Sequence, residues 1–157
     1  MRLSTFIEAH TEEILREWDS FARTLFLEKD PLSVLLLRDH AREMLAELTQ
    51  DIQTAQSPQQ QIDKSRGKIS PYHTDESAAS IHGVLRHEEG FSVSQVAAEF
   101  RALRAVVHRL WLPHISTFAT EVADDIMRCN ESIDKALAES LVTYGEFVIP
   151  KVRAATP

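Results

Sequence analysis

Apolar side chains recur every three or four residues along much of this chain, which is the spacing of one buried helix face. The first such pattern covers about residues 4–27, where Thr5 and Glu8 have the spacing of a capping box. The second covers about residues 30–54, where Asp30-Pro31 supplies an N-cap and a favoured first-turn proline. The sequence therefore predicts two long helices in its first third.

The pattern is lost between residues 54 and 74. This segment holds two prolines, a glycine and clustered glutamines, and its few apolar residues show little periodicity. Such a composition is typical of a surface connection. We predict a loop over 54–74.

A third helix is predicted over about residues 75–89. Its spacing directs Ala78, Ile81 and Leu85 inward. Gly90 follows the last apolar position, where a glycine commonly forms the C-terminal cap. The sequence thus indicates a helix that ends sharply at Gly90.

Two further helices complete the pattern. Ser92 and Gln95 form a second capping box at the start of the fourth helix, and Pro113 is expected to end or kink it. The fifth helix is predicted over about residues 120–147, where apolar positions again follow the spacing of a bundle seam. This seam lies at the end of the chain.

These elements predict an all-α fold. The 157 residues suffice for one domain with a real core, and only four glycines are present, so few turns can need positive φ. We expect a single-domain helical bundle of about five helices, for which a globin-like arrangement is one form. The helical domain is predicted to cover residues 1–149, with 150–157 as a C-terminal tail.

Charge and composition exclude several partners and compartments. The net charge of −7 opposes nonspecific binding to nucleic acid or to an anionic membrane. The N-terminus lacks the uninterrupted apolar region of a signal peptide, and no run approaches the length of a membrane span. A single cysteine, Cys129, permits no intrachain disulfide. We therefore expect a cytoplasmic protein.

Seven histidines raise the question of a metal or a haem. No two of them are four residues apart, and none follows a glutamate by three, so the usual helical zinc and di-iron signatures are missing. We predict no metal site. Haem needs only one axial histidine, so His82 or His108 could serve, and a haem-binding sensor stays open.

Catalytic groups are not evident in the sequence. Cys129 lies on the apolar seam of its helix, and no Gly-x-Ser-x-Gly elbow is present. The adjacent acids Glu88-Glu89 and Asp124-Asp125 would point about 100° apart on a helix, so we expect them on the surface rather than sharing a proton. The chain is predicted not to be an enzyme.

Several polar residues lie beside the buried seams of the last two helices, among them Glu99, Arg101, Arg104 and Asn130. A buried charge needs a partner, because an unpaired one is costly. Interhelical salt bridges and a ligand pocket both satisfy this requirement, and both stay open.

Several segments resemble the N-terminal sensory domain of bacterial sensor histidine kinases, and the related N-terminal domain of the RsbT co-antagonist type. The matching pieces, between about residues 37 and 144, are Leu37–Ala41, His82-Gly83, Arg86, Glu89-Gly90-Phe91, Ala98–Arg104, Leu110-Trp111 and Asn130–Ser140. The Glu-Phe-Arg-Ala-Leu-Arg and Asn-Glu-Ser-Ile-Asp segments are the most distinctive, while the amphipathic helices around them are generic.

This resemblance implies a helical signal-input module without catalysis of its own, acting on a downstream kinase or regulator protein. The long seam at the chain's end predicts a homodimer in which the last helix, and with it the first, packs against its copy. A helical protein–protein adaptor is the main alternative. The candidates for a ligand pocket or buried polar network are His82, Arg86, Glu99, Arg101, Arg104, Trp111 and Asn130.

Overall fold

The structure is a computed structural model that describes residues 1–25, 31–66 and 77–155, with side chains described for all of these except 31–39 and 146–155. These residues form one all-α domain without strands, as predicted. It has seven α-helices and a short 3-10 helix, more than the five expected. They are α1 (Leu3–Ala9), α2 (Thr11–Arg23), α3 (Pro31–Gln53), α4 (Pro58–Ser65), α5 (Ala78–Glu88), α6 (Val93–Trp111), η1 (Leu112–His114) and α7 (Thr120–Ala155).

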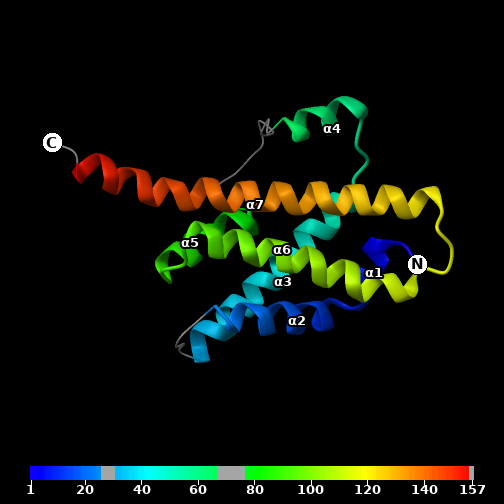
Figure 1. Cartoon of the computed structure of the whole chain (residues 1–157), viewed down its shortest axis with the longest axis horizontal. Helices are drawn as coiled ribbons and strands as arrows, with labels where there is room; N and C mark the ends of the chain where they lie inside the picture. Colours follow the sequence, from blue (N-terminus) through cyan, green and yellow to red (C-terminus); the bar gives the residue numbers. More distant parts are fainter. Residues whose placement is uncertain (26–30, 67–76, 156–157) are drawn as a thin grey trace.

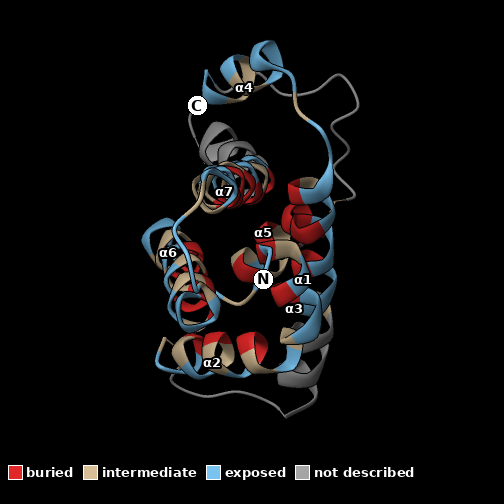
Figure 2. Cartoon of the chain, turned by 90° about the vertical axis from the view of Figure 1, so that its right-hand side faces the viewer, coloured by how far each residue is buried: buried red, intermediate tan, exposed pale blue. Residues whose placement is uncertain are grey.

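The longest helix, α7, runs beside most of the others (Figure 1). It packs against α1, α3, α4, α5 and α6, while α2 lies on the far side, against α6 and α3. Viewed from the end, the buried residues of these helices face a common centre, and α4 lies outside it with no buried residue (Figure 2). At 1.5 Å per residue, the 36 residues of α7 extend over about 54 Å. No described helix, α7 included, combines the length and the apolar character needed to cross a membrane.

The first predicted helix is in fact two helices that meet at His10. The backbone of His10 leaves helical geometry, with φ −123° and ψ 23°. The capping box expected at Thr5 is wrong, because α1 begins at Leu3 without a side-chain cap of its own. Instead the Asp125 carboxylate of α7 accepts from the Leu3 backbone N–H at 3.0 Å. A contact from a distant helix therefore fixes where α1 starts.

The predicted loop over 54–74 contains a helix, so this expectation was wrong over Pro58–Ser65. Ser57 is the N-cap of α4, with Pro58 in its first turn. The Ser57 hydroxyl accepts from the Gln60 backbone N–H, and the Gln60 side chain accepts from the Ser57 backbone N–H, which makes a full capping box. Residues 67–74 of the predicted loop lie outside the described residues.

The corner between α5 and α6 follows the sequence closely. Gly90 has φ 82°, and the Phe91 backbone N–H donates to the Arg86 carbonyl at 2.9 Å, so α5 ends in a glycine-based cap. Ser92 and Gln95 form the predicted capping box of α6. One inward position was wrong, because Ile81 is 39% exposed. The opposite face of α5 is the one that lies on α7.

Small residues bring α5 against α7. Gly83 is buried, and a Cβ placed on it would lie 2.0 Å from the Ser140 carbonyl oxygen. The Thr143 hydroxyl donates to the Ser80 carbonyl at 2.6 Å, and the Ser140 hydroxyl donates to the Ala79 carbonyl. Side chains of α7 thus bind backbone carbonyls of α5 over about one turn of each helix.

The ends of α6 and α7 differ in how well they were predicted. Pro113 lies in η1, directly after α6, as the sequence indicated. The start of α7 at Thr120 also agrees with the prediction, but the helix runs to Ala155 rather than to about residue 147. Residues 150–155 of the predicted tail therefore belong to α7, and 156–157 lie outside the described residues.

Candidate functional site

Three of the predicted candidates meet in the centre of the bundle. Glu99 of α6 has 0% exposure, and the Arg86 guanidinium of α5 binds it with two hydrogen bonds, Nε to Oε1 at 2.8 Å and Nη2 to Oε2 at 2.6 Å. His82, one turn earlier on α5, has its Nε2 3.3 Å from Glu99 Oε1. We call His82, Arg86 and Glu99 the buried triad.

Aromatic and backbone groups from two further helices surround the buried triad. The Trp18 indole N–H of α2 donates to the Glu99 carbonyl at 2.8 Å. The His82 ring packs edge-on against Phe100, with ring centres 5.7 Å apart, and parallel to His40 of α3 at 6.3 Å. The triad is therefore held from α2, α3, α5 and α6 at once.

The charges of the buried triad follow from burial and from Arg86. Burial lowers the pKa of His82, and the hydrogen bond to Glu99 opposes this only in part, so the imidazole is neutral near pH 7. Burial alone would raise the pKa of Glu99, but contacts with His82 and Arg86 outweigh it and hold this pKa below its usual value. Glu99 is thus an ionised carboxylate paired with Arg86.

The lowered pKa of His82 makes stability depend on pH. Below the ordinary value of 6.5, the unfolded chain binds a proton that the folded protein does not, so the free energy of unfolding should fall as the pH falls. Glu99 acts in the same direction below 4.5. We expect urea denaturation between about pH 7.5 and 5.5 to show this decline.

The matched variant for this pH test is His82→Gln, which keeps a hydrogen-bond donor toward Glu99 but does not titrate. It should flatten the pH dependence above about pH 5.5. Parallel curves for the wild type and His82→Gln would mean that His82 is not the titrating group.

The other four candidates lie elsewhere. Arg104 forms an ion pair with Asp134 across the boundary between α6 and α7. Asn130 lies on the α7 side of this boundary, and its Oδ1 has no hydrogen-bond partner among the described residues. Arg101 is exposed, and the Trp111 indole donates to the Met1 carbonyl at 3.0 Å, at the far end of α6. The structure therefore does not gather the seven candidates into one pocket.

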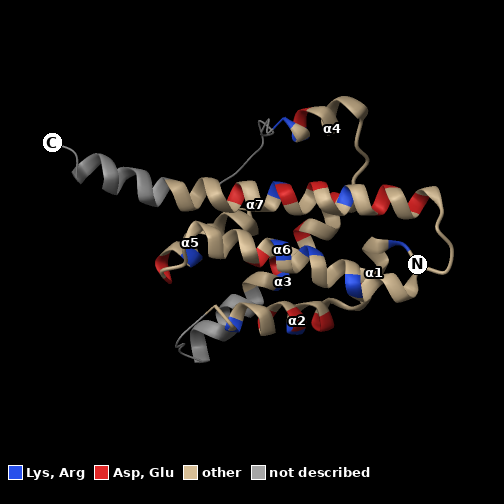
Figure 3. Ribbon diagram, viewed as in Figure 1, with Lys and Arg blue, Asp and Glu red and all other residues tan. Residues whose placement is uncertain are grey.

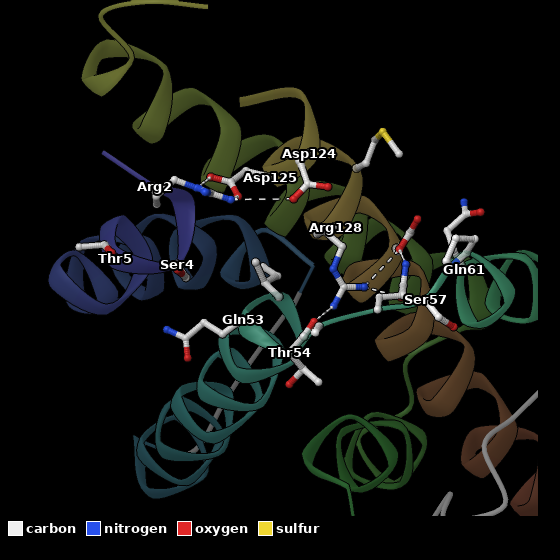
Figure 4. Close-up of a pocket in the computed structure, with 16 residues that line it drawn as sticks. Arg2, Ser4, Thr5, Gln53, Thr54, Ser57, Gln61, Asp124, Asp125 and Arg128 are labelled. Atoms are coloured by element: carbon white, nitrogen blue, oxygen red, sulfur yellow. Dashed lines mark hydrogen bonds and ion pairs between the residues drawn. The ribbon is translucent and has the colours of Figure 1, made fainter. Parts of the chain in front are cut away.

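A groove of about 620 Å³ lies where α1, the end of α3 and the start of α4 meet the first half of α7 (Figure 4). Most of its lining is polar, with Arg2, Gln53, Gln61 and Asp124 among the side chains. It is open to solvent on one side, and Asp124 is 60% exposed there. The groove is separate from the buried triad and shares no residue with it.

Two arginines form hydrogen bonds between the helices that line this groove. Arg128 of α7 donates from Nη2 to the carbonyls of Asp51 and Thr54, at 2.6 and 2.7 Å, and so caps the end of α3. Arg2 donates to Asp125 from Nε at 2.9 Å and from Nη2 at 2.7 Å. The expectation that Asp125 lies on the surface is wrong, since it is 4% exposed and paired.

Sequence reasoning missed Arg2, Arg128 and Asp125 as structural residues. Asp125 was expected on the surface together with Asp124, yet adjacent positions of a helix point about 100° apart, so one of the two can be buried while the other is exposed. Arg128 lies one position before the buried Cys129, which marks its side of α7 as partly inward. Its position next to a buried residue of α7 was the feature of the sequence that could have identified Arg128 as a structural residue.

Cys129 is not an activated nucleophile in this structure. Burial raises the pKa of the Cys129 thiol to about 12, so it is not a thiolate at neutral pH. No group of three or more His, Cys, Asp or Glu side chains in the described residues is placed to hold a metal ion. His82 is buried and its Nε2 faces Glu99, so iron could bind there only after that contact is broken. The described residues instead form two features, the buried ion pair between Arg86 and Glu99 and the open groove beside Arg128.

No protein family, curated protein or solved structure matches this chain.

Proposed function

We propose that this chain is a signal-input domain that passes a stimulus to a downstream kinase or regulator through α7, without catalysis of its own. The observation that carries the proposal is the position of α7, which contacts five other helices and forms one wall of the groove. A change at the groove would act on α7 directly, and a change at the buried triad would act on it through α5 and α6, which pack against α7. The resemblance of Ala98–Arg104 and Asn130–Ser140 to bacterial sensory domains supports the same role.

The mechanism we propose is a shift of α7 between two arrangements. Arg128 holds α7 to the end of α3, and Ser140 and Thr143 hold it to α5, so these two attachments define its present position. A ligand or partner in the groove would shift this equilibrium only if it bound one arrangement more tightly. A preference of about a hundredfold corresponds to roughly 2.7 kcal/mol, and it would move the ratio of the two arrangements from about 1:10 to about 10:1.

Output through α7 is proposed to occur in a homodimer. Acidic residues outnumber basic ones along the described part of α7 (Figure 3), but residues 140–145 carry no charge, so charge repulsion does not oppose the approach of a second copy at this stretch. Val142 adds an apolar side chain that is 39% exposed on this helix. In a two-fold dimer the same surface serves both copies, so Val142 of each copy would be buried in the interface.

The dimer is tested by light scattering at tens of micromolar protein. We expect a dimer mass, and Val142→Glu should weaken dimerisation roughly tenfold or more, because it buries a charge at an apolar contact. Ile81→Glu is the matched control, since Ile81 is likewise 39% exposed but lies on the face of α5 opposite α7. A monomer for the unchanged chain, or equal weakening by both variants, would contradict the proposed interface.

An adaptor role is the second candidate, and exposed apolar side chains near η1 favour it. Leu112 is 66% exposed and Phe118 is 76% exposed. Where such side chains form a contiguous apolar patch, that patch commonly marks a protein contact. If the adaptor role holds, Leu112→Ser should abolish partner binding while the dimer mass stays unchanged.

A further inference from the structure

Two histidines that are far apart in the sequence meet at the N-terminal end of the bundle. His10 lies at the break between α1 and α2, and His114 ends η1. Their ring centres are 5.1 Å apart, and the Phe6 ring lies 4.3 Å from the His10 ring and 5.1 Å from the His114 ring. Folding therefore brings together two imidazoles that no sequence spacing indicated.

The hydrogen bonding of His10 prepares it to bind a metal. Its Nδ1 lies 3.0 Å from the Phe6 carbonyl oxygen. A carbonyl oxygen only accepts, so Nδ1 carries the hydrogen, and in the neutral ring the lone pair is left on Nε2. Histidines that bind metals are commonly oriented by this kind of hydrogen bond to a backbone carbonyl.

The distance between the two rings fits a shared metal ion. A bond of about 2.1 Å from metal to nitrogen, extended by about 1.2 Å to the ring centre, places each centre about 3.3 Å from the metal. Two such rings at a tetrahedral angle of about 109° have centres roughly 5.4 Å apart. The observed 5.1 Å is close to this value. His114 is exposed, so its ring can turn a nitrogen toward the metal without disturbing the core.

We propose that His10 and His114 bind a divalent transition-metal ion of the class that prefers imidazole, such as Zn²⁺, Ni²⁺ or Cu²⁺. With two protein ligands, the remaining positions are open to water, which suits a site on the surface. The bound ion would link the break between α1 and α2 to the end of α6. It is independent of the groove and of the buried triad.

The experiment is a calorimetric titration of the full chain, without a histidine tag, with NiCl₂ alone. We expect one ion per chain with micromolar affinity, and His114→Ala should weaken it roughly tenfold or more. His87→Gln is the matched control and should leave the affinity unchanged, because the His87 ring contacts Tyr144 at the other end of the bundle. Cu²⁺ electron paramagnetic resonance should show two imidazole nitrogens in the wild type and one in His114→Ala.

A second measurement separates binding from folding. Ni²⁺ that binds the folded chain should raise its melting temperature, and this rise should disappear in His114→Ala while the metal-free melting temperature stays close to that of the wild type. The proposal is overturned if the wild type has no one-to-one site in the micromolar range. Equal affinity in the wild type and His114→Ala would also overturn it.

Discussion

Replacing Arg86 with alanine should lower the free energy of unfolding by about 3–5 kcal/mol, a large part of the stability of a domain this size. The variant leaves the Glu99 carboxylate, which has 0% exposure, without the guanidinium that binds both of its oxygens. An uncompensated buried charge is far more costly than a missing surface pair. Urea denaturation at neutral pH measures the loss.

Two controls separate the buried charge from lost packing. Arg109→Ala removes an arginine that pairs with Glu17 on the surface, where the side chains are 60% and 41% exposed, and should cost less than about 1 kcal/mol. The double variant Arg86→Met with Glu99→Leu removes both charges and should recover most of the stability. If Arg86→Ala and Arg109→Ala cost the same, the buried triad does not hold the domain together.

Elements with a local stop or start signal could be predicted from the sequence. Ser92 and Gln95 satisfy the first backbone groups of α6 by themselves, and Gly90 adopts the positive φ that ends α5. Pro31 likewise begins α3. These signals need no distant partner, so a sequence alone shows them.

Elements set by distant contacts could not be predicted. The apolar pattern continues through His10, and the start of α1 depends on Asp125, more than a hundred residues away. α4 is a different case, because its capping box at Ser57 was visible in the sequence. Its helix has no buried residue, so the search for apolar periodicity passed over it.

The candidate functional residues also differ in whether the sequence alone could reveal them. The position of Glu99 beside the apolar seam of α6 made it a candidate for burial, but Arg101 flanks the same Phe100 and is exposed, so the seam alone did not decide which of the two is buried. The pairing of Glu99 with Arg86 depends on how α5 and α6 meet, which no spacing within either helix specifies. The groove was not foreseen at all, since its lining comes from α1, α3, α4 and α7. Sites built from several helices require the fold before they can be recognised.

Replacing Gly83 with alanine should destabilise the domain by about 3 kcal/mol, at the upper end of the usual range for overpacking. The added Cβ would lie 2.0 Å from the Ser140 carbonyl oxygen and 2.5 Å from the Thr143 hydroxyl. The Ser140 carbonyl belongs to the backbone of α7, so it cannot move away from the added Cβ unless α5 and α7 separate. The hydrogen bonds from Ser140 and Thr143 to α5 would then break as well.

Gly145→Ala is the matched control for Gly83→Ala, because nothing lies within 4 Å of the added Cβ at this position of α7. Alanine is the better helix former, so this variant should stabilise the domain by about 0.5–1 kcal/mol. The two variants make the same chemical change with opposite expected signs, and thermal or urea unfolding measures both. If Gly83→Ala were neutral or stabilising, α5 and α7 would not be in close contact, and the proposed coupling of α7 to the buried triad would lose its structural basis.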